Sequence, residues 1–189
     1  MANTIQDFKS TLRGGGARPN LFEVILTDVP GGQGNYSSSD FSILCKAAQL
    51  PASNVASIDV PFRGRIFKVA GDRTFDTWTV TVINDEDFAI RRAMEGWMQS
   101  IAQYGDASGS TDPNEYMKEA TVRQLTRNPS TTGNTPFGGD LSVAAQYKFY
   151  DIFPTNISAI DLSYDSSDTI EEFTVEFQVQ YWTPFSGQN

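Results

Sequence analysis

The chain has 189 residues, one cysteine, no histidine and a formal net charge of −9 at pH 7. Without histidine, serine–histidine and cysteine–histidine nucleophile systems and most zinc sites are excluded, and the negative charge argues against a nucleic-acid interface based on phosphate neutralisation. The length fits one domain over residues 1–189, and neither a membrane-spanning apolar run nor a signal peptide is visible, so we expect no membrane anchor and synthesis in a cytosol.

The first predicted element is a short helix within an N-terminal arm, residues 1–16. Ile5, Phe8 and Leu12 have helical spacing, and a run of glycines at 14–16 ends the pattern. No lysine–serine pair follows these glycines, so they are interpreted as a linker and not as a phosphate-binding loop. The arm could dock on a neighbouring subunit or pack on its own domain, and both interpretations remain open.

Strands are predicted over 21–27 and 41–47, the second of which includes Cys45 as a small buried hydrophobe. Residues 49–65 are predicted to form an extended loop that leaves the domain body. Prolines at 51 and 61 exclude a regular central strand there, although apolar residues alternate with polar ones near its end. Residues 66–70 would then return to the sheet.

The most regular pattern follows at residues 68–87. Ala70-Gly71-Asp72 predicts a tight turn, and Trp78, Val80 and Val82 alternate with threonines as in a half-buried strand. Residues 84–87 predict a helix cap followed by acids in the first turn, so the acids need no metal ion to explain them. The helix would run over 85–104, with an apolar stripe formed by Ile90, Met94, Trp97 and Ile101.

Further strands are predicted at 121–127, 141–153 (ended by Pro154) and 157–164, followed by a turn at 165–168. The last strand, 172–181, is the most clearly amphipathic: Phe173, Val175, Phe177, Val179 and Tyr181 alternate with polar residues that include Glu172 and Glu176. About eight strands and one long helix favour a mainly β protein, an antiparallel sandwich or barrel with one packed helix. The expected core residues are Trp78, Val80, Val82, Trp97, Phe173, Val175 and Phe177.

Three segments resemble one known family. AGDRTFDTWTVTVIND (70–85) is similar to the most recognisable segment of the tail tube proteins of contractile-tailed bacteriophages. ARPNLFEVIL (17–26), IFPTN (152–156) and EEFTVEFQVQYW (171–182) fit the same family in the same order along the chain. The family's fold is a β-sandwich or split barrel with one helix, shared with the stacked-ring tube proteins of type VI secretion systems.

The resemblance implies a structural, non-enzymatic subunit of the virion tail, assembled in the host cytoplasm and needing no cofactor or metal. Hexameric rings would stack into a hollow cylinder inside the contractile sheath and let duplex DNA pass without specific binding. The implied partners are other copies of the chain, the sheath protein, the baseplate tube initiator, the tail terminator and the tape measure protein. Three alternatives are a baseplate tube initiator, a type VI-like ring protein and, in another class, a monomeric β-sandwich binding module.

Two surfaces follow from this expectation. Apolar side chains in the 49–65 loop need a surface to pack on, and an adjacent subunit offers one, although the loop could instead fold back over its own sandwich. The candidate subunit-contact residues are Ile58, Asp59, Val60, Phe62, Arg63 and Arg65. A bore that DNA slides through should be acidic, and Glu172 and Glu176 are candidates for its lining, although their strand could instead lie in the outer sheet.

Overall fold

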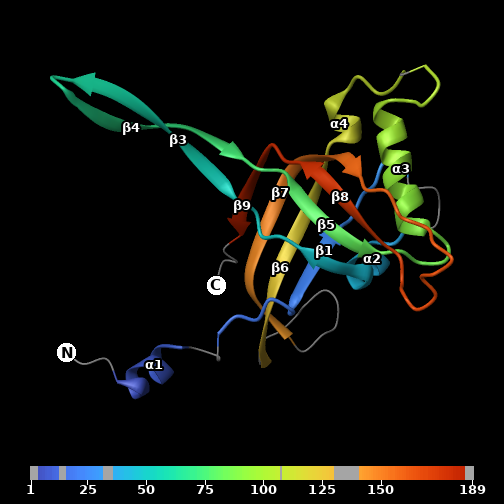
Figure 1. The fold of residues 1–189 in the computed structure, drawn as a ribbon, viewed down its shortest axis with the longest axis horizontal. Coiled ribbons are helices and arrows are strands. Elements are labelled where there is room, and N and C mark those ends of the chain that lie inside the picture. Colours follow the sequence, from blue (N-terminus) through green and yellow to red (C-terminus); the bar gives the residue numbers. More distant parts are fainter. Residues whose placement is uncertain (1–3, 13–15, 32–35, 107, 130–140, 186–189) are drawn as a thin grey trace.

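The computed structural model describes residues 4–12, 16–31, 36–106, 108–129 and 141–185 (Figure 1). Every strand pairing in this part of the chain is antiparallel, which confirms the predicted class. The strands are β1 (Phe22–Leu26), β2 (Cys45–Ala48), β3 (Ser53–Phe62), β4 (Arg65–Phe75), β5 (Trp78–Ile83), β6 (Lys118–Pro129), β7 (Leu141–Ile157), β8 (Glu172–Gln178) and β9 (Tyr181–Phe185). The helices are α1 (Ile5–Thr11), α2 (Ser38–Leu44), α3 (Ala89–Ile101) and α4 (Pro113–Tyr116).

The body is a sheet in the order β1-β6-β7-β8-β5-β2, with β9 also paired to β7. Strand β7 changes partners along its length: residues 146–150 lie between β6 and β9, whereas 153–157 pair with β8. Asp151, at the change, has a φ of 55°, and the register with β6 shifts beside it. Such a bulge bends a strand, so β7 links two sheets that fold over one another.

Aromatic side chains fill the space between the two sheets. Trp78 of β5 stacks on Phe149 of β7 with ring centroids 4.5 Å apart, and it also lies 5.4 Å from Phe177 of β8. All seven residues expected in the core are buried, each with at most 2% of its surface exposed. Cys45 is buried as well, and burial raises the pKa of its thiol to about 12.

Helix α3 closes one side of this core. Its stripe is formed as expected: Ile90, Met94 and Trp97 are buried, and Ile101 is partly buried against the same cluster. The Trp97 ring lies 5.9 Å from Phe177, and its Nε1 donates a hydrogen bond of 2.7 Å to the carbonyl oxygen of Tyr116. Thus α3 packs on the sheet and also holds the loop that carries α4.

The start of α3 differs from the prediction. The helix begins at Ala89 and its N-cap is Phe88, with a φ of 54° and no capping side chain. Asn84 instead extends the pairing of β5 with β8, because its backbone N–H and its side chain both donate to Glu171. Asp85 accepts from the backbone N–H of Asp87 at 2.6 Å and forms a local turn. The acids therefore precede the helix instead of occupying its first turn.

The strand predicted at 41–47 was largely wrong. Residues 38–44 form α2, with the Ser37 hydroxyl accepting from the backbone N–H of Asp40 at its start, and β2 begins only at Cys45. Phe41 is buried and Leu44 is packed against the core, so helical spacing was present in the apolar run. The capping serine was the missed signal.

Three predictions in the C-terminal half were also wrong in detail. Pro154 does not end β7: it lies inside the strand, at a register irregularity opposite Phe177, where a missing N–H is tolerated. Residues 158–164 form no strand. The last strand is interrupted at 179–180, and β9 turns away to pair with the first part of β7. Consequently Tyr181 is 42% exposed and stacks on Tyr150 with centroids 4.7 Å apart.

Within the described ranges, no helix combines the length and the apolar character needed to cross a membrane.

Candidate assembly surfaces

Strands β3 and β4 form a separate two-stranded sheet that projects from the body as a long hairpin (Figure 1). Its tip is a two-residue turn, Arg63-Gly64, between the paired residues Phe62 and Arg65. Both turn residues have positive φ, 45° and 79°, as the type I′ turn of tight hairpins requires. Gly64 adopts such a backbone without strain, and this fixes the register of the whole hairpin.

One face of the hairpin is apolar and lies in solvent. Residues directly opposite each other in an antiparallel pair share a face, and here Ile58 pairs with Val69 and Val60 with Phe67. Phe62 continues this face toward the tip. The exposed fractions of the five side chains are between 41% and 66%. We call this set the apolar ribbon: Ile58, Val60, Phe62, Phe67 and Val69.

The other face and the tip carry charge. Lys68 forms an ion pair of 3.1 Å with its cross-strand partner Asp59, and both side chains are at least half exposed. The guanidinium of Arg63 lies 5.5 Å from the centre of the Phe62 ring. Neither Arg63 nor Arg65 forms an ion pair within the part of the chain that the structure describes. The tip is therefore basic, with unpaired cations beside the apolar ribbon.

The base of the hairpin is fixed to the body. Trp182 of β9 contacts the Phe75 ring edge-on, with centroids 6.0 Å apart, and its Nε1 donates to the carbonyl oxygen of Ala52 at 3.2 Å. Asn54 also donates from its side chain to Asp76 at 2.9 Å. Such contacts on both strands set the direction in which the hairpin projects.

The sequence predicted a segment that leaves the body, but it gave this segment the wrong limits. Residues 66–70 do not return to the main sheet, and Ala70-Gly71-Asp72 is not a turn, because all of them belong to β4. Pro61 is accommodated because a two-stranded sheet contains only edge strands. Phe67 and Val69 share the exposed face of Ile58 and Val60 and were therefore missing from the predicted contact candidates. The Arg63-Gly64 pair between two alternating stretches was the signal that could have identified them.

Helix α1 provides a second exposed apolar surface. A capping box starts the helix, with Thr4 and Asp7 each hydrogen-bonded to the other's backbone N–H. These bonds, first the one from the Thr4 backbone and then the one from its side chain, lower the pKa of Asp7. Ile5, Phe8 and Leu12 are 72%, 63% and 43% exposed, and no side chain of the helix is buried. Gly14 and Gly15 lie outside the described residues.

The two lumen candidates lie on the outward face of β8, because Phe173, Val175 and Phe177 take the inward face. Glu176 pairs with Thr79 across to β5. Glu172 forms an ion pair of 2.6 Å with Lys46 of β2, which the sequence had not indicated. This face is thus polar and rich in threonine, and it is less acidic than the pattern of β8 alone suggests.

The outward face of the other sheet is polar as well, but its charges are balanced. Arg123 of β6 lies 3.4 Å from Glu23 of β1, and Lys148 of β7 lies 2.6 Å from Glu119. The hydrogen bond with Glu119 raises the pKa of Lys148. The two outward faces therefore differ in charge. On the face of β1, β6 and β7, these two cations and two acids are all paired. On the face of β5 and β8, the Glu176 carboxylate has no ion pair among the described residues.

Among the residues that the structure describes, no group of three or more acidic or cysteine side chains is arranged to hold a metal ion. The exposed surfaces of this part of the chain are an apolar ribbon with a basic tip, an exposed amphipathic helix and two polar sheet faces.

Comparisons with known proteins identify the family. A family model described as "Phage tail tube protein" matches residues 17–184. The chain is 37% identical to tail tube protein gp19 of Enterobacteria phages T4 and T6 over 166 residues, which cover 88% of this chain and 90% of either relative. It is 24% identical to the tail tube protein of Serratia phage KSP90, over 93% of both chains.

Solved structures show the same fold at low identity. The tube terminating cap of the anti-feeding prophage is matched with a TM-score of 0.58 at 17% identity, over 89% of this chain and 90% of that one. The sheath-tube complex of the extracellular contractile injection system PVC is matched with a TM-score of 0.52 at 12% identity, over 94% and 96%. The family model and the identity to the T4 and T6 proteins show that the chain belongs to the phage tail tube protein family and is a structural component of a contractile phage tail.

Proposed function

We propose that the chain polymerises through the β3–β4 hairpin into stacked hexameric rings, which form the hollow tube inside a contractile sheath. The observation that carries this proposal is the apolar ribbon, which lies in solvent on an anchored hairpin. An isolated hairpin is at best marginally stable, so this one needs a further surface. Burying its five side chains would contribute on the order of 5 kcal/mol to each contact.

The sheet edges support assembly into rings. The order of the body sheet ends at β1 and β2, so each of these strands has an edge that pairs with no strand in the described part of the chain. Neighbours in a closed ring would cover such edges. If six subunits each lend about four strands to an inner barrel, the backbone diameter is about 50 Å, and inward side chains leave a bore of roughly 40 Å. That width admits duplex DNA.

We assign the bore to the outward face of β5 and β8, where Glu172 and Glu176 lie. The Lys46–Glu172 pair is neutral, so Glu176 leaves this face net negative. The other polar face pairs its acids with Arg123 and Lys148. DNA adheres to walls on which cations can neutralise its phosphates, so the more negative face is the better wall for a channel.

Helix α1 is an arm for a neighbouring subunit. Its apolar side chains have no partner on their own domain among the described residues, and this favours docking on another copy over packing on the body. The sheath protein, baseplate tube initiator, tail terminator and tape measure protein complete the set of partners. Assembly takes place in the host cytoplasm, and the role is structural and not catalytic.

Electron microscopy of the purified protein in negative stain tests the proposal. Long hollow tubes with six-fold symmetry in end views are expected. Isolated rings that never stack would favour a baseplate initiator or another ring protein, and a monomer at all concentrations would contradict a tube subunit.

A further inference from the structure

The loop between β7 and β8, residues 158–171, packs Ile160 against the core but carries three other large apolar side chains in solvent. Leu162, Tyr164 and Ile170 have exposed fractions of 80%, 107% and 73%. The two ends of the loop are nevertheless fixed, because the backbone N–H of Ser158 donates to Thr174 at 2.9 Å and the carbonyl oxygen of Glu171 accepts from Asn84 at 2.8 Å. Residues of the loop also line an open hollow of about 410 Å³. The segment is thus anchored to the body, while Leu162, Tyr164 and Ile170 are not buried by any residue that the structure describes.

The charge of the loop indicates what could cover it. It contains Asp161, Asp165, Asp168 and Glu171 and no lysine or arginine. None of the three aspartates forms an ion pair with a residue that the structure describes. Asn84 joins this loop to the end of β5, where residues 85–87 add three more acids. An occupant with apolar side chains and positive charge would be complementary.

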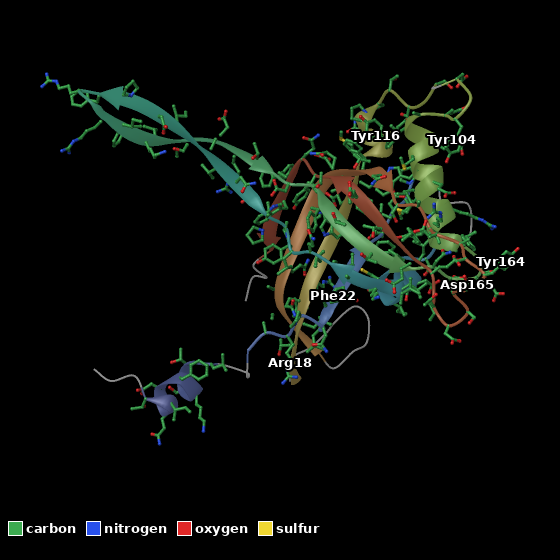
Figure 2. All side chains as sticks on the ribbon, viewed as in Figure 1. Arg18, Phe22, Tyr104, Tyr116, Tyr164 and Asp165 are labelled. Carbon is green, nitrogen blue, oxygen red and sulfur yellow. The ribbon has the colours of Figure 1, made fainter. Side chains whose placement is uncertain are left out.

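The hairpin has both properties and lies at the other end of the molecule. Tyr164 and Asp165 are at one extreme of the long axis, and the β3–β4 hairpin extends to the opposite extreme (Figure 2). The apolar ribbon ends at a tip with Arg63 and Arg65. Two complementary surfaces on opposite ends of one chain generate a head-to-tail contact that repeats from copy to copy.

We propose that the loop 158–171 is the acceptor for the β3–β4 hairpin of a second copy of this chain, in the next ring. The apolar ribbon packs against Leu162, Tyr164 and Ile170, and Arg63 and Arg65 face the loop aspartates. The aromatic face of Tyr164 is also a suitable partner for a guanidinium. The inference rests on the proposed stacking of rings and adds which two surfaces meet.

A charge exchange tests the contact. One variant carries Arg63→Glu and Arg65→Glu, and the other carries Asp161→Lys and Asp165→Lys; all four side chains are exposed, so folding should be retained. Each variant alone should need a protein concentration about tenfold or more above that of the parent to form tubes. An equimolar mixture of the two should assemble better than either variant alone, because rings that alternate between the variants place opposite charges at both kinds of interface. A chain carrying all four substitutions should recover assembly to within about threefold of the parent.

A cross-link gives a second measurement. Phe62→Cys and Leu162→Cys in the same chain should be joined between copies by a short bismaleimide, giving a ladder of covalent multimers from assembled tubes. Cys45 does not compete, because it is buried and its thiol is therefore out of reach of the reagent. The matched control pairs Phe62→Cys with Tyr104→Cys, a position just after α3 whose exposed fraction of 76% is close to the 80% of Leu162 (Figure 2).

Two results would overturn the acceptor assignment and leave the proposed tube function intact. One is a yield of cross-linked multimers no higher than that of the control pair. The other is a chain with all four substitutions that needs as high a protein concentration to form tubes as the more impaired double variant. A parent protein that never forms tubes would contradict the proposed function itself, and the inference with it.

Discussion

Trp97 shows how a single side chain holds two parts of the molecule together. It is fully buried, contacts Phe177 through its ring and holds the α4 loop through its hydrogen bond to Tyr116. Replacing Trp97 by alanine should lower the free energy of unfolding by about 3–5 kcal/mol, because a large cavity forms and the partly buried carbonyl of Tyr116 loses its donor. Chemical denaturation measures this loss.

Gln99→Ala is the matched control, since Gln99 is exposed on the same helix. It should change the free energy of unfolding by no more than about 0.5 kcal/mol. Equal stabilities for the two variants would mean that α3 does not belong to the core.

For single residues, the sequence best predicted burial in strands where apolar and polar side chains alternate. This alternation correctly predicted that Trp78, Val80 and Val82 and their paired residues on β8 are buried. A strand with one buried face needs an apolar side chain at every second position. It could not show the Lys46–Glu172 ion pair, whose members are 126 residues apart in the chain. Such a pair depends on which strands become neighbours, and β2 and β8 lie on opposite sides of β5.

The hairpin is the element on which assembly should depend. In one variant, residues 56–72 are replaced by Asn-Gly, so that a two-residue turn links Val55 to its paired residue Arg73. The contacts of Asn54 and Phe75 at the base of the hairpin are retained. The shortened protein should keep its circular dichroism spectrum and melting temperature, because nothing in the core is removed. It should remain monomeric in sedimentation at concentrations where the parent forms tubes. Normal tubes from it would exclude the hairpin as an assembly element.

Two neighbouring residues separate the faces of the hairpin. Phe67 lies on the apolar ribbon and Ile66 on the opposite face, with nearly equal exposed fractions of 66% and 64%. Phe67→Asp should prevent assembly because it places a charge in the contact, whereas Ile66→Asp should assemble as the parent does. Light scattering measures tube formation by both variants. If Ile66→Asp failed to assemble and Phe67→Asp assembled normally, the contact would lie on the other face.

Helix α3 makes a second element-scale prediction at its closest approach to another segment. A Cβ added to Gly96 would lie 2.6 Å from the carbonyl oxygen of Gly31, closer than real Cβ contacts allow. Alanine in a helix is normally favoured over glycine by about 1 kcal/mol, yet here the backbone must shift. Gly96→Ala should therefore destabilise the protein by about 1–3 kcal/mol in a denaturation experiment.

Gly105→Ala is the control for that substitution, because no atom lies within 4 Å of the added Cβ. Its free energy of unfolding should match that of the parent. A Gly96→Ala protein more stable than the parent would show that residues 28–31 yield easily, so that helix propensity decides the outcome.

Element type was predictable wherever periodicity was long, and element limits were not. The apolar stripe of α3 was predicted correctly, but the helix begins at Ala89 and not at residue 85. The reason is that Asn84 extends the β5–β8 pairing instead of capping the helix. The hairpin limits were missed for a related reason: the alternation in β4 resembles that of a sheet strand, and only tertiary structure shows that β3 is its single partner.

On the scale of the whole molecule, the two polar sheet faces decide which side can line a channel. A sandwich buries the inward face of both sheets, so each outward face must meet solvent, a neighbour or the bore. The sequence predicted the polar faces from alternation, whereas their difference in charge balance emerged only from the ion pairs of Arg123 and Lys148. The proposed assignment of the bore to the outward face of β5 and β8 follows from this difference.

Glu176→Lys tests that assignment. In stacked rings the substitution would repeat around and along the bore, and each added lysine offers another phosphate contact whose strength falls as salt rises. Tubes of the variant should therefore retain short linear duplex DNA at low salt, whereas parent tubes should not. Closed circular DNA, which cannot enter through an open end, is the control and should stay free with both proteins. Cosedimentation at several salt concentrations measures binding: equal retention of linear and circular DNA would place Glu176 on the outside of the tube, and no retention of either would remove it from any surface that DNA contacts.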